Sequence, residues 1–153
     1  MKKILFITLL ITFGYISCSN FSNIKDIFKE RIPIEKAIKK KQLMDKSRNP
    51  AYKYLITKKL KEKIIEINDV IVKDITVSGN IDYDFCVIVE VPHQKGNIEC
   101  FIYSKNLDII SKLQRNTSKI DITGHFDRFF TLLDDTYTKI EIINATILIK
   151  GVK

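Results

Sequence analysis

The spacing of the apolar residues constrains the fold of this chain more than any other feature, and that spacing changes near Glu66. Beyond Glu66 apolar and polar side chains alternate, as they do over residues 70–82. A period of two places successive side chains on opposite faces of an extended strand, whereas an amphipathic helix has a period near 3.6. The chain after Glu66 is therefore predicted to be mainly β.

The alternating runs predict five strands with one helical break. The expected strands are residues 70–82, 85–91, 98–103, 119–127 and 137–150. Between the third and the fourth strand, Leu107, Ile110 and Leu113 recur every three positions, which indicates a short helix within residues 105–114. Gly79 and Gly124 lie inside the first and fourth expected strands, where glycine is typical of a bulge or a sharp bend around a barrel.

Three strands, a helix and two strands form the order of a five-stranded oligonucleotide/oligosaccharide-binding (OB) barrel. The predicted fold class is mainly β, with broken basic helices before this barrel. Residues 75–81, 98–101, 120–126 and 140–147 resemble the tRNA-anti-like OB-fold proteins of bacterial envelopes. The shared motifs reflect barrel geometry, so the resemblance implies a fold and leaves the ligand open.

A removable leader is expected at the N-terminus. Lys2 and Lys3 precede an apolar run over residues 4–16, which is shorter than the roughly 20 residues that cross a bilayer as a helix. The sequence that ends at Cys18, Tyr-Ile-Ser-Cys, resembles the lipobox of bacterial lipoproteins. That resemblance implies cleavage before Cys18, a diacylglyceryl thioether on its sulfur and acylation of the new N-terminus. An ordinary secretory signal and an uncleaved tether are the alternatives.

These features divide the chain into four segments. We expect a lipoprotein signal peptide over residues 1–17, a polar tether over 18–23, a basic helical arm over 24–65 and an OB domain over 66–153. Lipid on Cys18 would place the protein in the cell envelope, on the periplasmic or surface side of a membrane.

The positive charge of the chain is concentrated in the arm. Residues 24–64 contain 14 Lys and Arg against 5 Asp and Glu, whereas residues 65–153 contain 10 against 13. Pro33 and Asn49-Pro50 are predicted to break the arm into separate helices, of which the last, from Ala51, is amphipathic and expected to pack on the barrel. A basic segment of this kind can lie along anionic headgroups or a wall polymer, or it can be a solvated face.

A candidate ligand face lies on the third strand. OB barrels bind along their second and third strands, and Phe101 and Tyr103 share one side of the third strand with Glu99. Two aromatic rings at this spacing can stack on bases or sugars. The alternative is that a helix of the arm covers both rings.

The charges near this face disfavour nucleic acid. Acidic residues cluster on the first three strands, and only Lys95 and Lys105 lie close to them in the sequence. A nucleic-acid groove needs basic side chains along the phosphates. The acidic residues are Asp82, Asp84, Glu90 and Glu99.

Cys86 and Cys100 remain once Cys18 is assigned to lipid. An even pair in an exported protein is compatible with a disulfide, and their position in strand-like runs is equally compatible with two buried thiols. No CxxC motif or zinc-ligand set is present.

The sequence predicts no catalytic residue, metal site or cofactor. His93 and His125 have no nucleophile placed beside them and are expected to be exposed. The acidic pairs Asp82/Asp84 and Asp134/Asp135 fit turns and do not continue into a calcium-loop pattern. The chain is thus expected to be a binding or scaffolding protein for a protein, peptidoglycan or sugar ligand. A nucleic-acid-binding module is the first alternative and an enzyme the second.

Overall fold

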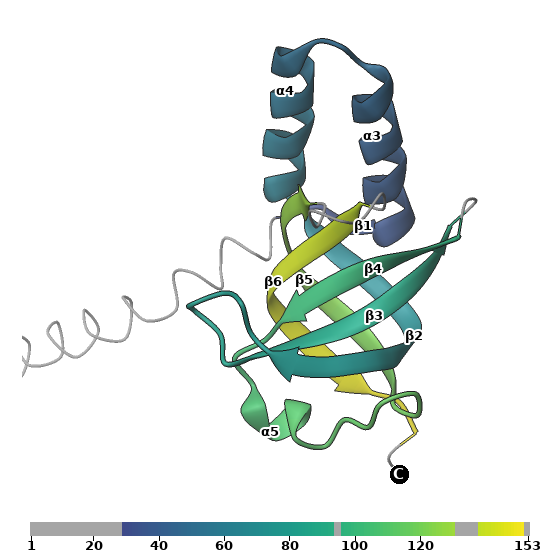
Figure 1. Ribbon diagram of the computed structural model, residues 1–153, viewed down its shortest axis with the longest axis vertical. Coiled ribbons are helices and arrows are strands. Elements are labelled where there is room, and N and C mark those ends of the chain that lie inside the picture. The colour runs from purple at the N-terminus through teal and green to yellow at the C-terminus, as the bar shows by residue number, and fades with distance from the viewer. Residues whose placement is uncertain (1–28, 94–95, 131–137, 152–153) are drawn as a thin grey trace, which may run out of the picture.

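The computed structural model describes residues 29–93, 96–130 and 138–151, so the predicted signal peptide, Cys18, the tether, Lys95 and the pair Asp134/Asp135 lie outside the described residues. Figure 1 shows a barrel with two helices standing side by side on one end and a short helix at the other. The elements are β1 (Arg31–Pro33), α3 (Ile34–Lys46), α4 (Pro50–Lys61), β2 (Ile64–Val77), β3 (Phe85–His93), β4 (Gly96–Tyr103), α5 (Leu107–Ile110), β5 (Lys119–Phe130) and β6 (Lys139–Ile149). Within the described residues, no helix is both long and apolar enough to span a membrane.

The strands β2 to β6 close into an OB-type barrel, which confirms the predicted fold class. The sheet order is β1-β2-β3-β4-β6-β5, and a further pairing between β2 and β5 closes the ring. The β4–β6 pair is parallel, whereas β2–β3, β3–β4, β5–β6 and β2–β5 are antiparallel. The helix α5 falls between the third and fourth barrel strands, as the spacing of apolar residues predicted.

Strand β2 pairs with both β3 and β5, and so closes the barrel. Its first half, from Ile64 to Ile71, pairs with β5, and its second half, from Val72 to Val77, pairs with β3. A bulge between Ile67 and Val70 interrupts the pairing with β5 shortly before the change, and there Asp69 takes a φ of 64°. This left-handed conformation is one that Asp tolerates better than most residues.

The carboxylate of Asp121 holds this bulge. The backbone nitrogen of Asp69 donates to Asp121 Oδ1 at 2.7 Å, and the Asp69 carboxylate pairs with Lys119 at 2.8 Å and Lys150 at 3.1 Å. The sequence prediction had assigned the bend to Gly79. That assignment was wrong, because β2 begins and ends earlier than predicted and Gly79 lies beyond its last residue.

The base of the arm belongs to the barrel core. Ile32, Ile34, Ala37 and Ile38 lie in the same buried cluster as the barrel strands, together with Leu60 at the end of α4. Strand β1 pairs in parallel with the start of β2. The expected boundary between residues 65 and 66 therefore falls inside β2, and the arm closes one end of the barrel.

The helices of the arm break where the sequence predicted. Helix α3 begins directly after Pro33, and α4 has Pro50 at its first position and Asn49 as its cap. The Asn49 side-chain oxygen accepts from the backbone nitrogens of Ala51 at 2.9 Å and Tyr52 at 3.4 Å. This satisfies donors that the first turn of a helix leaves without partners.

The apolar stripe of α4 does not pack along the barrel as expected. Leu60 is buried and Ile56 is half-buried, but Leu55 is 52% exposed and Tyr52 is 40% exposed. The helical spacing of apolar residues in the sequence continues from Leu60 to Ile64, but Ile64 is the first residue of β2. Most of α4 therefore stands clear of the barrel.

Gly124 provides a test of the barrel packing. It lies on the buried face of β5, where an added Cβ would come within 2.6 Å of Ile142 Cγ2 and 3.1 Å of Ala145 Cα. We expect Gly124→Ala to lower the free energy of unfolding by about 1–3 kcal/mol, because the stiff side chain of Ile142 cannot move away without cost. Urea denaturation followed by circular dichroism measures this change.

The control is Gly79→Ala, since nothing lies within 4 Å of a Cβ at that position. Its effect should stay within about 0.5 kcal/mol. Equal stabilities for the two variants would contradict the close approach of β5 and β6.

Candidate ligand-binding site

A shallow cavity of about 240 Å³ lies on the outer face of the barrel, between the β2–β3 connection and strands β4, β5 and β6. It includes both aromatic residues that the sequence singled out. Its lining residues are Thr76, Val77, Gly79, Asn80, Cys86, Phe101, Tyr103, Arg128, Phe130 and Glu141.

Strand alternation places these side chains on one face. In β4, Cys100 and Ile102 point into the core, so Phe101 and Tyr103 point outward. The pairing register then places Glu141 of β6 beside Phe101. Arg128 of β5 is in turn opposite Glu141, so three neighbouring strands contribute to the same surface.

The aromatic rings are covered in part by residues of the barrel itself. The Tyr103 ring packs 5.4 Å from the Tyr83 ring, and the Phe101 ring packs edge-on at 5.2 Å from Phe130. Tyr103 is 6% exposed, whereas Phe101 is half-buried and borders the cavity. The predicted alternative, in which an arm helix covers the pair, is wrong: the cover comes from the β2–β3 connection and β5.

A hydrogen-bonded tyrosine fixes the β2–β3 connection over this face. The Tyr83 hydroxyl lies 2.9 Å from Asn144 Oδ1 and accepts from the Asn144 backbone nitrogen at 3.0 Å. Asn144 has a φ of 50°, a conformation that Asn adopts more readily than most residues. These hydrogen bonds attach the β2–β3 connection to β6, so the part of the connection that lines the cavity is held in place.

The polar part of the cavity is a buried carboxylate with a cationic partner. Glu141 is 1% exposed, and its carboxylate accepts hydrogen bonds from Arg128 Nε and, at 3.4 Å, from Asn80 Nδ2. The hydrogen bond to Glu141 raises the pKa of Arg128 above its usual value. The rest of the Arg128 side chain is exposed and lies over the Phe130 ring, 5.6 Å from its centroid.

Sequence reasoning missed Arg128, Phe130 and Glu141. One signal was present, because Glu141 lies between Ile140 and Ile142 at a position where the alternation turns a side chain outward. Its partner could not be inferred, since the β5–β6 register contains bulges.

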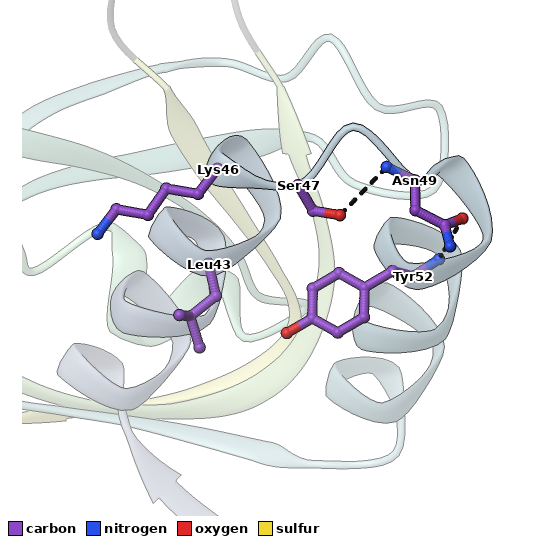
Figure 2. Close-up of a pocket in the computed structure, with 5 residues that line it drawn as sticks. All are labelled: Leu43, Lys46, Ser47, Asn49 and Tyr52. Atoms are coloured by element: carbon purple, nitrogen blue, oxygen red, sulfur yellow. Dashed lines mark hydrogen bonds between the residues drawn. The ribbon is translucent and has the colours of Figure 1, made fainter.

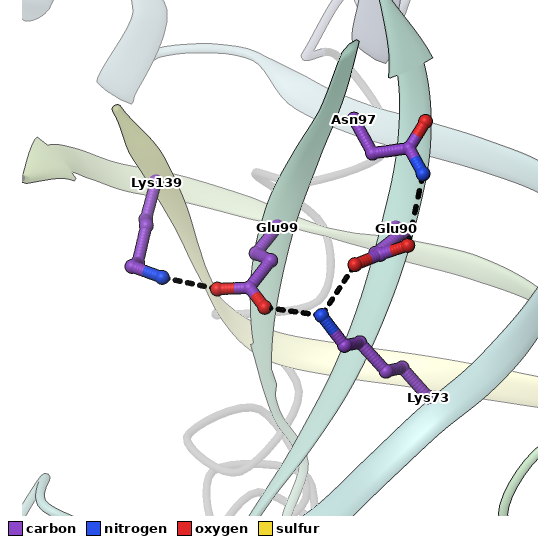
Figure 3. Close-up of polar contacts among 5 residues, drawn as sticks. All are labelled: Lys73, Glu90, Asn97, Glu99 and Lys139. Carbon is purple, nitrogen blue, oxygen red and sulfur yellow. Dashed lines mark hydrogen bonds and ion pairs between the residues drawn. The ribbon is translucent and has the colours of Figure 1, made fainter. Parts of the chain in front are cut away.

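A second network pairs two residues of the acidic cluster, Glu90 and Glu99, with lysines (Figure 3). Lys73 Nζ donates to Glu90 and, at 2.6 Å, to Glu99, and Lys139 Nζ also donates to Glu99. These hydrogen bonds lower the pKa of both glutamates. The sequence argument that only Lys95 and Lys105 oppose this acidic cluster was therefore incomplete, because β2 and β6 bring in lysines from distant positions.

The two cysteines lie on opposite faces of adjacent strands. Cys100 belongs to the barrel core, whereas Cys86 borders the outer cavity and pairs across the ladder with Tyr103. Both are free and buried, so of the two predicted alternatives the structure has the thiols and not the disulfide. Burial raises the pKa of Cys86 to about 11 and that of Cys100 to about 12.

The histidines are half-buried, not exposed as predicted. The His93 ring lies 2.8 Å from the Gln42 side chain, and His125 Nδ1 lies 3.3 Å from Lys29 Nζ. Neither histidine lines the cavity. Within the part of the chain that the structure describes, no group of three or more His, Cys, Asp or Glu residues could hold a metal ion.

The closed barrel and the order of its strands define the chain as an OB-fold protein. No protein-family model and no curated protein sequence matches it. Among solved structures it is similar to the mitochondrial single-stranded DNA binding protein Rim1 from S. cerevisiae, with 11% identity and a TM-score of 0.34. The match covers 59% of this chain and 97% of that one. A similarity this low does not bear on ligand or partner.

The buried thiols lead to a testable expectation. In the native protein at pH 8, iodoacetamide should modify Cys86 and Cys100 far more slowly than in urea, because burial keeps both thiols protonated and inaccessible. Unfolding frees the thiols to ionise near their ordinary pKa of 9.0, so stability should fall as the pH rises above 9. Peptide mass spectrometry measures modification at each cysteine.

Non-reducing digestion provides the control for this experiment. A peptide pair joined through Cys86 and Cys100 would contradict the placement of the two side chains on opposite faces of the sheet.

Proposed function

We propose that the protein is a bacterial lipoprotein, anchored to an envelope membrane through acyl chains on Cys18, and that its OB barrel binds a sugar ring of an envelope polymer such as peptidoglycan. The leader and its resemblance to a lipobox support the anchor. The cavity beside Phe101 supports the binding role. In this proposal the barrel is a binding module and has no catalytic role.

The observation that carries the binding proposal is the combination of aromatic and paired polar groups in one cavity. At about 240 Å³, the cavity is smaller than the roughly 300 Å³ at which pockets for drug-sized ligands begin, so it fits one ring of a longer ligand. Phe101 and Phe130 offer apolar surface to such a ring. Asn80 and the exposed part of Arg128, both held by the buried Glu141, offer hydrogen-bonding groups to its hydroxyls and amides.

Charge favours a neutral ring over a nucleotide. Arg128 is paired with Glu141, and Lys73 and Lys139 are paired with Glu99, so each of these cations already has a carboxylate partner. A phosphate would have to compete with those carboxylates. A sugar needs only hydrogen bonds and an apolar surface, and the cavity supplies both.

The anchor is tested by labelling cells with palmitate. Label should appear in the wild-type protein and be lost in Cys18→Ala, because the thioether and the processing that precedes further acylation both need the cysteine sulfur. The control is Cys86→Ala, which removes a buried thiol and should leave the label unchanged. Equal labelling of wild type and Cys18→Ala would contradict the anchor.

The ligand is tested by titrating the full chain in detergent with soluble peptidoglycan fragments. Phe101→Ala should weaken binding about tenfold, because stacking on an aromatic ring is worth about 1–3 kcal/mol in the comparable case of bases. The control is Phe85→Ala, since Phe85 is a 39% exposed ring outside the cavity.

A parallel titration with a single-stranded oligonucleotide over a salt series examines the alternative. Tighter binding to the oligonucleotide, weakening steeply as salt rises and sensitive to Phe101→Ala, would replace the sugar proposal with the nucleic-acid-binding one. Peptidoglycan binding that is unchanged in Phe101→Ala would remove the cavity from the proposal.

A further inference from the structure

The helical hairpin formed by α3 and α4 exposes apolar side chains that lie outside the cavity. Leu43 is 46% exposed, and on α4 Tyr52 is 40% and Leu55 52% exposed. Figure 2 shows Leu43 and Tyr52 across from each other, beside the turn that contains Ser47 and Asn49. Leu55 follows Tyr52 by three positions and so lies on the same side of α4. We call Leu43, Tyr52 and Leu55 the hairpin surface.

The charges around the hairpin surface are almost all positive. Residues 34–62 contain 10 Lys and Arg against 3 Asp and Glu. Helix α4 has no acidic residue, and Asp45 near the turn is paired with Lys41. The other two acids, Glu35 and Glu62, lie at the ends of the helices next to the barrel. An anionic partner therefore fits the free end of the hairpin.

The mixture of apolar and basic groups fits one anionic partner best, the surface of a phospholipid bilayer. Helices that lie in the membrane interface bury leucine or aromatic side chains and keep lysines at the headgroups, where tyrosine is also enriched. Nucleic acid would use the lysines and leave Leu43 and Leu55 in water. An exposed apolar cluster of this kind indicates a docking surface.

The lengths of chain allow this contact alongside an N-terminal anchor. The 12 residues of α4 extend about 18 Å from the barrel, at 1.5 Å per residue. The 11 residues from Cys18 to Phe28 can span up to about 37 Å when extended. The hairpin and a lipid on Cys18 can therefore reach the same bilayer. Figure 1 shows α5 at the end of the barrel away from the hairpin.

We propose that the free end of the α3–α4 hairpin inserts its hairpin surface into the headgroup region of an anionic bilayer and serves as a second membrane contact. The contact rests on the proposed envelope location and does not require acylation of Cys18. It orients the barrel with α3 and α4 toward the bilayer and α5 away from it.

The absence of tryptophan from the sequence makes a direct test possible. Leu55→Trp places a single reporter on the hairpin surface, and Leu107→Trp places one on α5, at a position of similar exposure. Both full-length variants are reconstituted into vesicles of phosphatidylcholine with or without phosphatidylglycerol. The attachment of the N-terminus is the same in both, so any difference between the reporters reports on the hairpin.

We expect the Leu55→Trp emission to shift to shorter wavelength and to be quenched by brominated lipid when phosphatidylglycerol is present, with neither change for Leu107→Trp. Adding Lys58→Gln should lower the ratio of inserted to exposed reporter about fivefold, because each basic residue near an anionic surface contributes about that factor. Lys112→Gln, near α5, is the matched control and should change nothing.

Three results would overturn the proposal. One is equal exposure of the two reporters to water in anionic vesicles. A second is a Leu55→Trp shift that depends on protein concentration without vesicles, which would mean that a second copy covers the surface. A third is a shift produced by an oligonucleotide and not by lipid. Palmitate labelling of cells tests the lipid anchor, whereas tryptophan fluorescence with vesicles tests the hairpin contact. The failure of one proposal can therefore be distinguished from the failure of the other.

Discussion

The pairing of one strand, β2, with two different partners is the constraint on which the barrel depends. Its first half closes the ring against β5 and its second half begins the β2–β3–β4 meander. Pairing passes from β5 to β3 between Ile71 and Val72, shortly after the Asp69 bulge, where the lysine pairs and Asp121 hold a left-handed backbone without glycine. The positions of β3 and β4, and therefore of Phe101 and Tyr103, follow from that closure.

The sequence predicted the buried faces of the strands well, but it predicted the connections between strands and the contacts between distant residues poorly. The alternation over residues 119–127 correctly predicted a strand, and its inward side chains Ile120, Ile122 and Phe126 lie in the core, as the interior of a closed barrel requires. It failed beyond Gly79, where Ile81 continues the alternation although its side chain is fully exposed in the β2–β3 connection. The partner of Glu141 could not be predicted either, because long-range pairs depend on register.

The barrel and the α3–α4 hairpin differ in charge, and this difference is not visible in the composition of the whole chain. On the barrel, cations and carboxylates meet in close pairs such as Arg128 with Glu141, and the outer face presents rings and hydrogen-bonding groups in place of net charge. On the hairpin, α4 carries four lysines and no acidic residue, and α3 carries five lysines against Glu35 and Asp45. The basic character of the whole chain is thus a property of one projecting element, and it does not describe the cavity.

The short strand β1 determines how tension would enter the molecule. A pull on the N-terminus reaches the barrel through three residues that pair with β2, supported by the hydrogen bond from Ile64 nitrogen to Glu30 oxygen and the Lys63–Glu30 ion pair. Ile32, within β1, and Ile34, the first residue of α3, both lie in the buried core. A pull on the N-terminus would therefore load β1 before any strand of the barrel, and release of β1 would expose Ile32 and the neighbouring end of the core.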